Sequence, residues 1–204
     1  MRIFSFAFAC LIFVSTTTKS QYSIQLEAGT NLANASTPPD LSPSAIWKTR
    51  VGFVGDLLTS YSLSDEFSLQ TGLRFIQKGT KVDFLYNLTM THNYIEVPVY
   101  ARFKVIDFGP QILVVGGPSF SFLTNSYTQG TSPIYGSLSH NTNEQYKSYD
   151  ISLDAGVEFE NPVTKNLSFI ISAKYSFGFI EIDKTSANEQ SRDLRLTLGF
   201  AYSL

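Results

Sequence analysis

Residues 94–105 read Tyr94-Ile-Glu-Val-Pro-Val-Tyr-Ala-Arg-Phe-Lys-Val105, and apolar side chains occupy every second position of this stretch. Successive side chains of an extended strand point to opposite faces, so the stretch predicts a strand with one apolar face. The other face carries Glu96, Arg102 and Lys104. A soluble sandwich buries its apolar face in a core, whereas a membrane barrel turns that face toward lipid. The direction of the apolar face therefore decides the class of protein.

The first twenty residues predict export. A single positive charge at Arg2 precedes an apolar run that ends at Val14, and polar residues follow. This pattern is typical of a secretory signal peptide and is too short for a membrane-spanning helix. We expect a signal peptide at 1–20 and one mature domain at 21–204. A lipid anchor on Cys10 is the less favoured interpretation, because this cysteine lies inside the apolar run.

Composition excludes several classes of protein. The only cysteine, Cys10, lies in the predicted signal peptide, so the mature chain cannot form a disulfide framework. The formal net charge of −2 argues against a basic nucleic-acid surface, and we expect no nucleic-acid partner. No window of the mature sequence has an apolar run as long as a spanning helix requires.

Alternation of the same kind recurs in eight segments of the mature chain, which predicts an all-β fold. The segments are residues 22–30, 49–62, 67–78, 94–105, 111–123, 150–159, 167–179 and 193–204. No segment of comparable length has a convincing helical period. We therefore expect eight strands that follow one another along the chain.

The connections between these segments are alternately short and long. The short ones, 64–66, 107–110 and 160–166, are built from turn residues, and the long ones are 31–48, 79–93, 124–149 and 180–192. All short turns then fall at one end of an up-and-down meander, as in outer-membrane barrels with short periplasmic turns and long outer loops. The last segment can pair with the first and leave no free edge. The expected fold is an eight-stranded antiparallel up-and-down transmembrane β-barrel.

Charges of both signs share the face opposite the apolar side chains. They are Glu27, Asp56, Glu96, Asp154 and Glu158, balanced by Arg74, Arg102, Lys104, Lys174 and Arg195. Side chains just fill the interior of an eight-stranded barrel, so these charges can neutralise one another there. The predicted result is a plugged lumen. The alternative is the solvated outer face of a soluble sandwich.

Turn positions predict two of the ion pairs. A turn centred on Asp65 puts Asp56 opposite Arg74, and a turn centred near Thr164 puts Asp154 opposite Lys174.

Aromatic residues of the apolar face gather near the strand ends, as in the girdles of membrane barrels. The expected periplasmic girdle is Tyr61, Phe67, Phe103, Phe159, Phe169 and Tyr202, and the expected outer girdle is Phe75, Phe120, Phe122, Phe177 and Phe179. Two prolines, Pro98 and Pro118, interrupt the pattern at nearly one height, with residue 98 opposite 119. Because proline removes a ladder donor, we expect a bulge or kink there.

Several short motifs resemble a known family. The run Tyr94-Ile-Glu-Val-Pro98, the Lys78-Gly79 pair before it and the Gly116-Gly-Pro-Ser-Phe-Ser-Phe-Leu123 run after it are similar to the PorT-like outer-membrane β-barrel family of Bacteroidetes-type bacteria. This resemblance implies a small barrel inserted in the outer membrane. Some members of that family are associated with protein secretion, and the family supplies no catalytic residues.

Residues with catalytic or metal-binding chemistry are few. Two histidines, His92 and His140, fall in predicted outer loops, so we expect no metal site and no cofactor. An outer-membrane lipid enzyme would need a nucleophile, a base and an orienting carboxylate, for which Ser119, Ser121, His92 and Asp83 are the available parts. Serines on a barrel wall are ordinarily packing residues, so we expect no enzyme.

The long outer connection 124–149 is nearly uncharged and holds Tyr127, Tyr135, Tyr146 and Tyr149. Tyrosine offers apolar area and a polar tip, so these four predict a binding surface for a glycan, a peptide or a protein, with a solvated loop as the alternative. We expect a bacterial outer-membrane protein with a structural or interaction role, which contacts lipid and has envelope or secretion proteins or surface glycans as candidate partners. The alternatives are a soluble lipocalin-like barrel, a lipid-modifying enzyme and a narrow pore.

Overall fold

The computed structural model of the chain describes residues 21–35, 46–83, 87–132, 136–180 and 190–204. These residues form nine β-strands: β1 (Tyr22–Ala35), β2 (Ile46–Ser62), β3 (Phe67–Asp83), β4 (Asn87–Asp107), β5 (Gln111–Ser132), β6 (Gly136–Asn141), β7 (Tyr149–Pro162), β8 (Leu167–Gly178) and β9 (Ser191–Ser203). In the part of the chain that the structure describes, no helix is long and apolar enough to cross a membrane. The predicted signal peptide lies outside these residues.

Eight of the strands close into one antiparallel barrel. Each pairs with its neighbour in the chain, β5 pairs with β7 across the short β6, and β9 pairs with β1. The last pairing runs from Ser23–Ser203 to Ala35–Ser191, so the barrel has no open edge. This confirms the predicted eight-stranded up-and-down barrel. The ninth strand, β6, pairs only with the outer end of β5.

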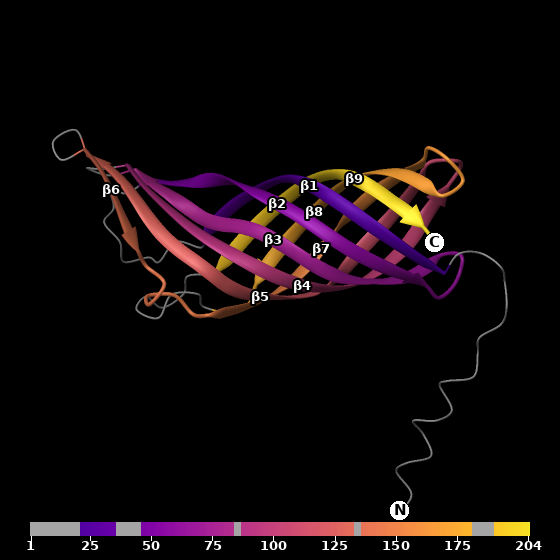
Figure 1. Cartoon of the computed structure of the whole chain (residues 1–204), viewed down its shortest axis with the longest axis horizontal. Helices are drawn as coiled ribbons and strands as arrows, with labels where there is room; N and C mark the ends of the chain where they lie inside the picture. Colours follow the sequence, from indigo (N-terminus) through magenta and orange to yellow (C-terminus); the bar gives the residue numbers. More distant parts are fainter. Residues whose placement is uncertain (1–20, 36–45, 84–86, 133–135, 181–189) are drawn as a thin grey trace, which may run out of the picture.

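The two ends of the barrel differ, as Figure 1 shows. Short turns and the C-terminal residue Leu204 lie at one end, and β6 lies at the other. Strands β2 to β5 contain 17, 17, 21 and 22 residues, whereas β7, β8 and β9 contain 14, 12 and 13. One side of the barrel wall therefore extends beyond the rest at the end with β6.

This extension corrects the predicted loops 79–93 and 124–149. Strand β3 continues to Asp83, β4 begins at Asn87, and β5 continues to Ser132 before β6 begins. Above the apolar band both faces of the sheet carry polar residues, so the alternation that marks a strand inside the band disappears. Backbone pairing continues without it.

Burial shows which face of the barrel is which. On β4 the Val99 and Phe103 side chains point outward and are 44% and 50% exposed, whereas Glu96 and Arg102 point into the lumen at 0% and 5%. Both predicted aromatic girdles also point outward. This arrangement confirms the expected direction of the apolar face. It contradicts the lipocalin-like alternative, which needs an apolar lumen for its ligand.

Two small apolar clusters also lie in the lumen. Val54, Ile76 and Tyr94 form the first, nearer the outer end. Tyr100, Leu113 and Val115 form the second. These groups fill space between the polar side chains, as close packing of a protein interior requires.

One of the two predicted ion-pair registers is confirmed and the other is wrong. Asp56 lies directly opposite Arg74, as a turn centred on Asp65 requires. Asp154, however, lies opposite Ser176, and Lys174 lies opposite Gly156. The β7–β8 turn is centred on residue 165 and not on 164, so a shift of one in the turn moves the partner by two positions.

The prolines interrupt pairing without changing register. Pro98 lies opposite Ser119, as predicted, and β4–β5 pairing resumes at Ala101 and Gly116 in the same register. The predicted bulge at this point is wrong, because the register shifts of this strand pair lie at 93/94 and 104/106. The hydroxyl of Thr71 on β3 donates to the Pro98 carbonyl at 2.8 Å. A side chain thus replaces part of the interrupted ladder.

The outward position of Val99 at mid-height of the band gives a depth-dependent prediction. Val99→Arg should lower the free energy of unfolding by about 2–4 kcal/mol, because it places a guanidinium among acyl chains. Val105→Arg, the matched control near the short turns, should cost about 0–1 kcal/mol. Urea titration of both variants in lipid vesicles measures the difference. Equal costs would contradict a lipid-facing band.

Candidate functional site: the charged lumen

The centre of the lumen is organised around Arg74 of β3. Its Nε atom donates to Asp56 Oδ1 at 2.6 Å, and its Nη1 atom donates to Glu96 Oε2 at 3.3 Å and to the Tyr100 hydroxyl at 2.9 Å. The same Nη1 lies 3.5 Å from Asp154 Oδ2 on β7. These partners come from β2, β4 and β7, so Arg74 connects opposite walls of the barrel. The side chain is completely buried.

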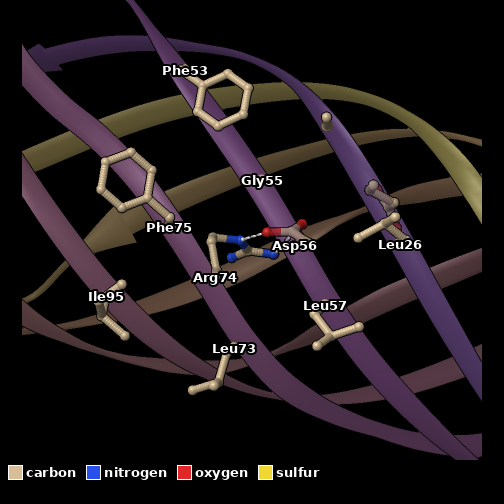
Figure 2. Close-up of a pocket in the computed structure, with 11 residues that line it drawn as sticks. Leu26, Phe53, Gly55, Asp56, Leu57, Leu73, Arg74, Phe75 and Ile95 are labelled. Atoms are coloured by element: carbon tan, nitrogen blue, oxygen red, sulfur yellow. Dashed lines mark hydrogen bonds and ion pairs between the residues drawn. The ribbon is translucent and has the colours of Figure 1, made fainter.

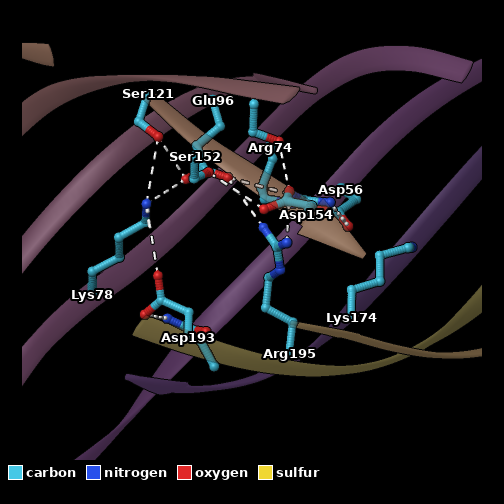
Figure 3. A network of polar contacts seen from close by, with 12 residues as sticks. Asp56, Arg74, Lys78, Glu96, Ser121, Ser152, Asp154, Lys174, Asp193 and Arg195 are labelled. Atoms are coloured by element: carbon cyan, nitrogen blue, oxygen red, sulfur yellow. Dashed lines mark hydrogen bonds and ion pairs between the residues drawn. The ribbon is translucent and has the colours of Figure 1, made fainter. Parts of the chain in front are cut away.

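Arg195 of β9 enters the same layer from the other side. Its Nη2 atom lies 2.6 Å from Asp154 Oδ2, and its Nη1 atom donates to Glu96 Oε2 at 3.4 Å. The Asp154 carboxylate also accepts hydrogen bonds from Ser119 at 2.6 Å and from the Tyr100 hydroxyl. Figure 3 shows the two arginines converging on these carboxylates.

Above this layer, toward β6, Lys78 is surrounded by carboxylates. Its Nζ atom lies 2.8 Å from Glu96, 3.4 Å from Asp150 and 3.7 Å from Asp193. Lys78, Asp150 and Asp193 were absent from the predicted lumen set although each stands at the end of a predicted strand, in phase with its polar face. The alternation of polar and apolar residues was therefore sufficient to predict that these three side chains lie in the lumen.

A third layer lies nearer the short turns. Arg102 Nη2 lies 2.7 Å from Glu158, and Lys174 Nζ lies 2.7 Å from the same carboxylate. Lys174 is also 3.7 Å from Glu27, which accepts hydrogen bonds from Gln25, Ser172 and Thr197. The layer is therefore closed by residues from β1, β4, β7, β8 and β9.

Lys104 does not belong to the lumen network, which corrects its predicted role. It lies at the rim, where its Nζ atom is 2.8 Å from Asp107 at the end of β4, and the Asp107 side chain is 53% exposed. The alternation of polar and apolar residues continues past the end of the apolar band. The position of Lys104 in this alternation therefore could not show that it lies at the rim and not in the lumen. The other nine predicted charges are buried in the lumen: Glu27, Asp56, Arg74, Glu96, Arg102, Asp154, Glu158, Lys174 and Arg195.

The network continues directly behind the lipid-facing wall. Figure 2 shows a shallow depression on the outward surface, where Phe53, Phe75, Leu57 and Leu73 surround Gly55. The Phe53 ring lies 3.2 Å from the position that a Cβ would occupy at Gly55, so the aromatic side chain covers the bare backbone. The Arg74–Asp56 ion pair lies behind this wall. One strand thickness separates the apolar band from the buried charges.

The four outer-loop tyrosines do not form one surface. Tyr146 is buried and packs against His92, with ring centroids 4.1 Å apart and ring planes tilted by 56°. Tyr149 opens β7 opposite Phe122 and points outward at 54% exposure. Tyr127 is half-buried on β5, and Tyr135 lies outside the described residues. The predicted surface is thus wrong for Tyr146, which lies between β6 and β7 and is buried, and the role of the exposed Tyr149 stays a prediction.

The candidate catalytic parts are also separated. Ser119 and Ser121 donate to Asp154 and Glu96, at 2.6 and 2.7 Å. His92 Nδ1 instead lies 2.8 Å from the Ser126 hydroxyl, and both residues are at most 1% exposed. Among the described residues no group of three or more His, Cys, Asp or Glu side chains is arranged to hold a metal ion.

Residues 15–184 match the family model described as outer membrane protein beta-barrel domain. The chain belongs to this family. It is an outer-membrane β-barrel protein, located in the bacterial outer membrane. The match does not test the narrower PorT-like assignment, which stays a prediction. No functionally curated protein is a significant sequence match to the chain.

Solved structures share the fold at low sequence identity. A major outer membrane protein from Thermus thermophilus is 13% identical, with a TM-score of 0.51 over 89% of this chain and 98% of that one. OprG from Pseudomonas aeruginosa is 11% identical, with a TM-score of 0.49 over 90% and 96%. Ail of Yersinia pestis is 11% identical, with a TM-score of 0.46 over 89% and 99%. Identities this low concern the fold alone.

The burial of Arg74 predicts a large cost for breaking the network. Arg74→Met leaves Asp56 buried without its cation, so the free energy of unfolding should fall by about 3–5 kcal/mol. Lys104→Met, the matched control, removes a pair at the solvated rim and should cost less than about 1 kcal/mol. Urea unfolding in detergent micelles measures both. A small cost for Arg74→Met would show that the central ion pairs contribute little to stability.

Proposed function

We propose that this protein is a structural or interaction barrel of the outer membrane whose lumen does not conduct solutes. The observation that carries the proposal is the convergence of Arg74 and Arg195 on Asp154 and Glu96 across the middle of the lumen. Ion pairs from opposite walls cross the lumen at this height, where a water path would have to pass. The apolar clusters on either side add to this plug.

The same packing argues against the pore and enzyme alternatives, and we propose that the protein is not an enzyme. A pore needs a water-filled lumen, and the interior of a small eight-stranded barrel is just wide enough for side chains to fill. The one serine–histidine contact among the described residues, Ser126 with His92, is closed to substrate because both side chains are buried. Ser119 and Ser121 are buried as well, and they donate to Asp154 and Glu96, carboxylates that are held in ion pairs with Arg195 and Lys78.

The extended wall formed by the outer ends of β3, β4 and β5 with β6 is the proposed interaction surface. These strands project beyond the barrel on one side only, and the described part of β6 exposes Ser139 and His140. A sheet that projects from the membrane offers a rigid platform for an envelope or secretion protein or a surface glycan. A PorT-like role in secretion or envelope assembly would use this platform.

A sealed lumen predicts electrical silence. Purified protein reconstituted in planar bilayers should give no current steps, because ions cannot cross the layer of Arg74 and Arg195. A general porin carried through the same purification is the positive control for insertion. Current steps that scale with the amount of folded protein would contradict the proposal and favour the narrow pore.

If the extended wall is the interaction surface, binding of a partner should depend on residues at the outer end of the barrel. Protein carrying an affinity tag in the 163–166 turn should recover a specific partner from native membranes after cross-linking. Ser139→Arg with His140→Glu should reduce recovery about tenfold if a contact is lost there. Glu66→Arg at the opposite end is the matched control and should leave recovery unchanged. Equal recovery from all three proteins would remove β6 from the interaction surface.

A further inference from the structure

One buried cation in the lumen lacks the partner that the other five have. Arg74, Lys78, Arg102, Lys174 and Arg195 each lie within 2.8 Å of at least one carboxylate oxygen. Arg50 of β2 is only 8% exposed, yet it makes no ion pair with any described residue. Its Nη1 atom is buried without a hydrogen-bond partner in the described part of the chain. An unpaired buried guanidinium is costly, so its retention needs a reason.

The position of Arg50 is at the outer end of the network. It lies opposite Ala33 on β1, and Ala33 in turn lies opposite Asp193 on β9. Its Nη1 atom lies 2.7 Å from the position that a Cβ would occupy at Gly52. The missing side chain at Gly52 therefore leaves the space in which the guanidinium lies.

A second unpartnered atom lies across from Gly52. Asn31 on β1 is opposite this glycine, and its Nδ2 atom donates to the Gln77 carbonyl at 3.0 Å and to Asp193 Oδ1 at 3.2 Å. These two bonds fix the orientation of the amide. Its Oδ1 atom then remains a buried acceptor without a donor among the described residues. The outer end of the lumen thus offers a strong cationic donor and a neutral acceptor on adjacent strands.

We propose that Arg50 binds a phosphate-class oxyanion at the outer mouth of the lumen. The guanidinium fork can donate two parallel hydrogen bonds to two oxygens of one phosphate. A phosphate hydroxyl can donate to Asn31 Oδ1, which a fully deprotonated anion cannot do. The ligand is either free inorganic phosphate or the phosphate group of a molecule at the cell surface. This binding site is separate from the central plug and does not require the lumen to conduct.

Bound water is the simpler occupant, since water also satisfies buried polar atoms. Water and phosphate differ in charge, so they predict opposite responses to added anion. If only water bridges these atoms, phosphate has no saturable effect. If phosphate binds the native barrel, the unfolding midpoint rises with the logarithm of its concentration.

The experiment is urea unfolding of the folded full-length barrel in zwitterionic detergent, titrated with sodium phosphate at constant ionic strength set with chloride. The wild type should show a saturable rise in midpoint. Arg50→Met should weaken the apparent affinity for phosphate about tenfold or more, because both charge and fork are lost. Lys81→Met removes a cation from the exposed outer surface of the same end and should keep the wild-type affinity within about twofold.

Two further arms complete the test. Arg50→Lys keeps the charge without the fork and should show intermediate affinity, which also covers a failure of Arg50→Met to fold. Glucose 6-phosphate replaces inorganic phosphate to separate the two sources. Binding of the sugar phosphate with at least the affinity of the free ion supports a surface molecule, and binding of inorganic phosphate alone supports the free ion. No saturable response in the wild type, or the same response in Arg50→Met, would overturn the proposal.

Discussion

A charged side chain that is buried in the lumen needs an opposite charge inside the lumen. The rest of this structure depends on that requirement. Burying an ion costs several kcal/mol unless an opposite charge and hydrogen bonds replace water. Arg74 meets the requirement with Asp56, Glu96 and Asp154, which come from three other strands. Because each partner is fixed on a different wall, the ion pairs also fix how the walls face one another. The apolar side chains then point outward, where they contact the acyl chains of the outer membrane.

The network explains why the barrel has distinct regions along its axis. In the middle, paired charges and small apolar clusters lie in the interior. Toward the short turns, the rim is solvated and Lys104 pairs with Asp107 instead of entering the network. Toward β6, the pairing among described residues becomes incomplete at Asn31 and Arg50, and the wall continues on one side only. Interaction with other molecules is therefore expected at the outer end, where neither charge nor backbone is fully enclosed.

Much of this architecture could be predicted from the sequence, because the two faces of a barrel strand have opposite polarity. Nine of ten proposed lumen charges are buried there, and the turn at Asp65 correctly predicted the Asp56–Arg74 pair. The prediction that Asp154 lies opposite Lys174 was wrong, since composition does not determine which residue is the centre of a long turn. The strand extensions were missed because alternation ends with the apolar band. The burial of Tyr146 was missed because composition does not show that its ring packs against His92.

Accessibility along residues 94–105 tests the central claim most directly. Cysteines placed one at a time through this stretch and spin-labelled can be read in lipid vesicles by collision with oxygen, which enters the bilayer, and with a charged nickel chelate, which stays in water. Labels at Ile95, Val99 and Phe103 should respond to oxygen, and those at Glu96 and Tyr100 should respond to neither reagent. Response of Glu96 and Tyr100 to the nickel chelate would show a water-filled lumen and contradict the sealed network.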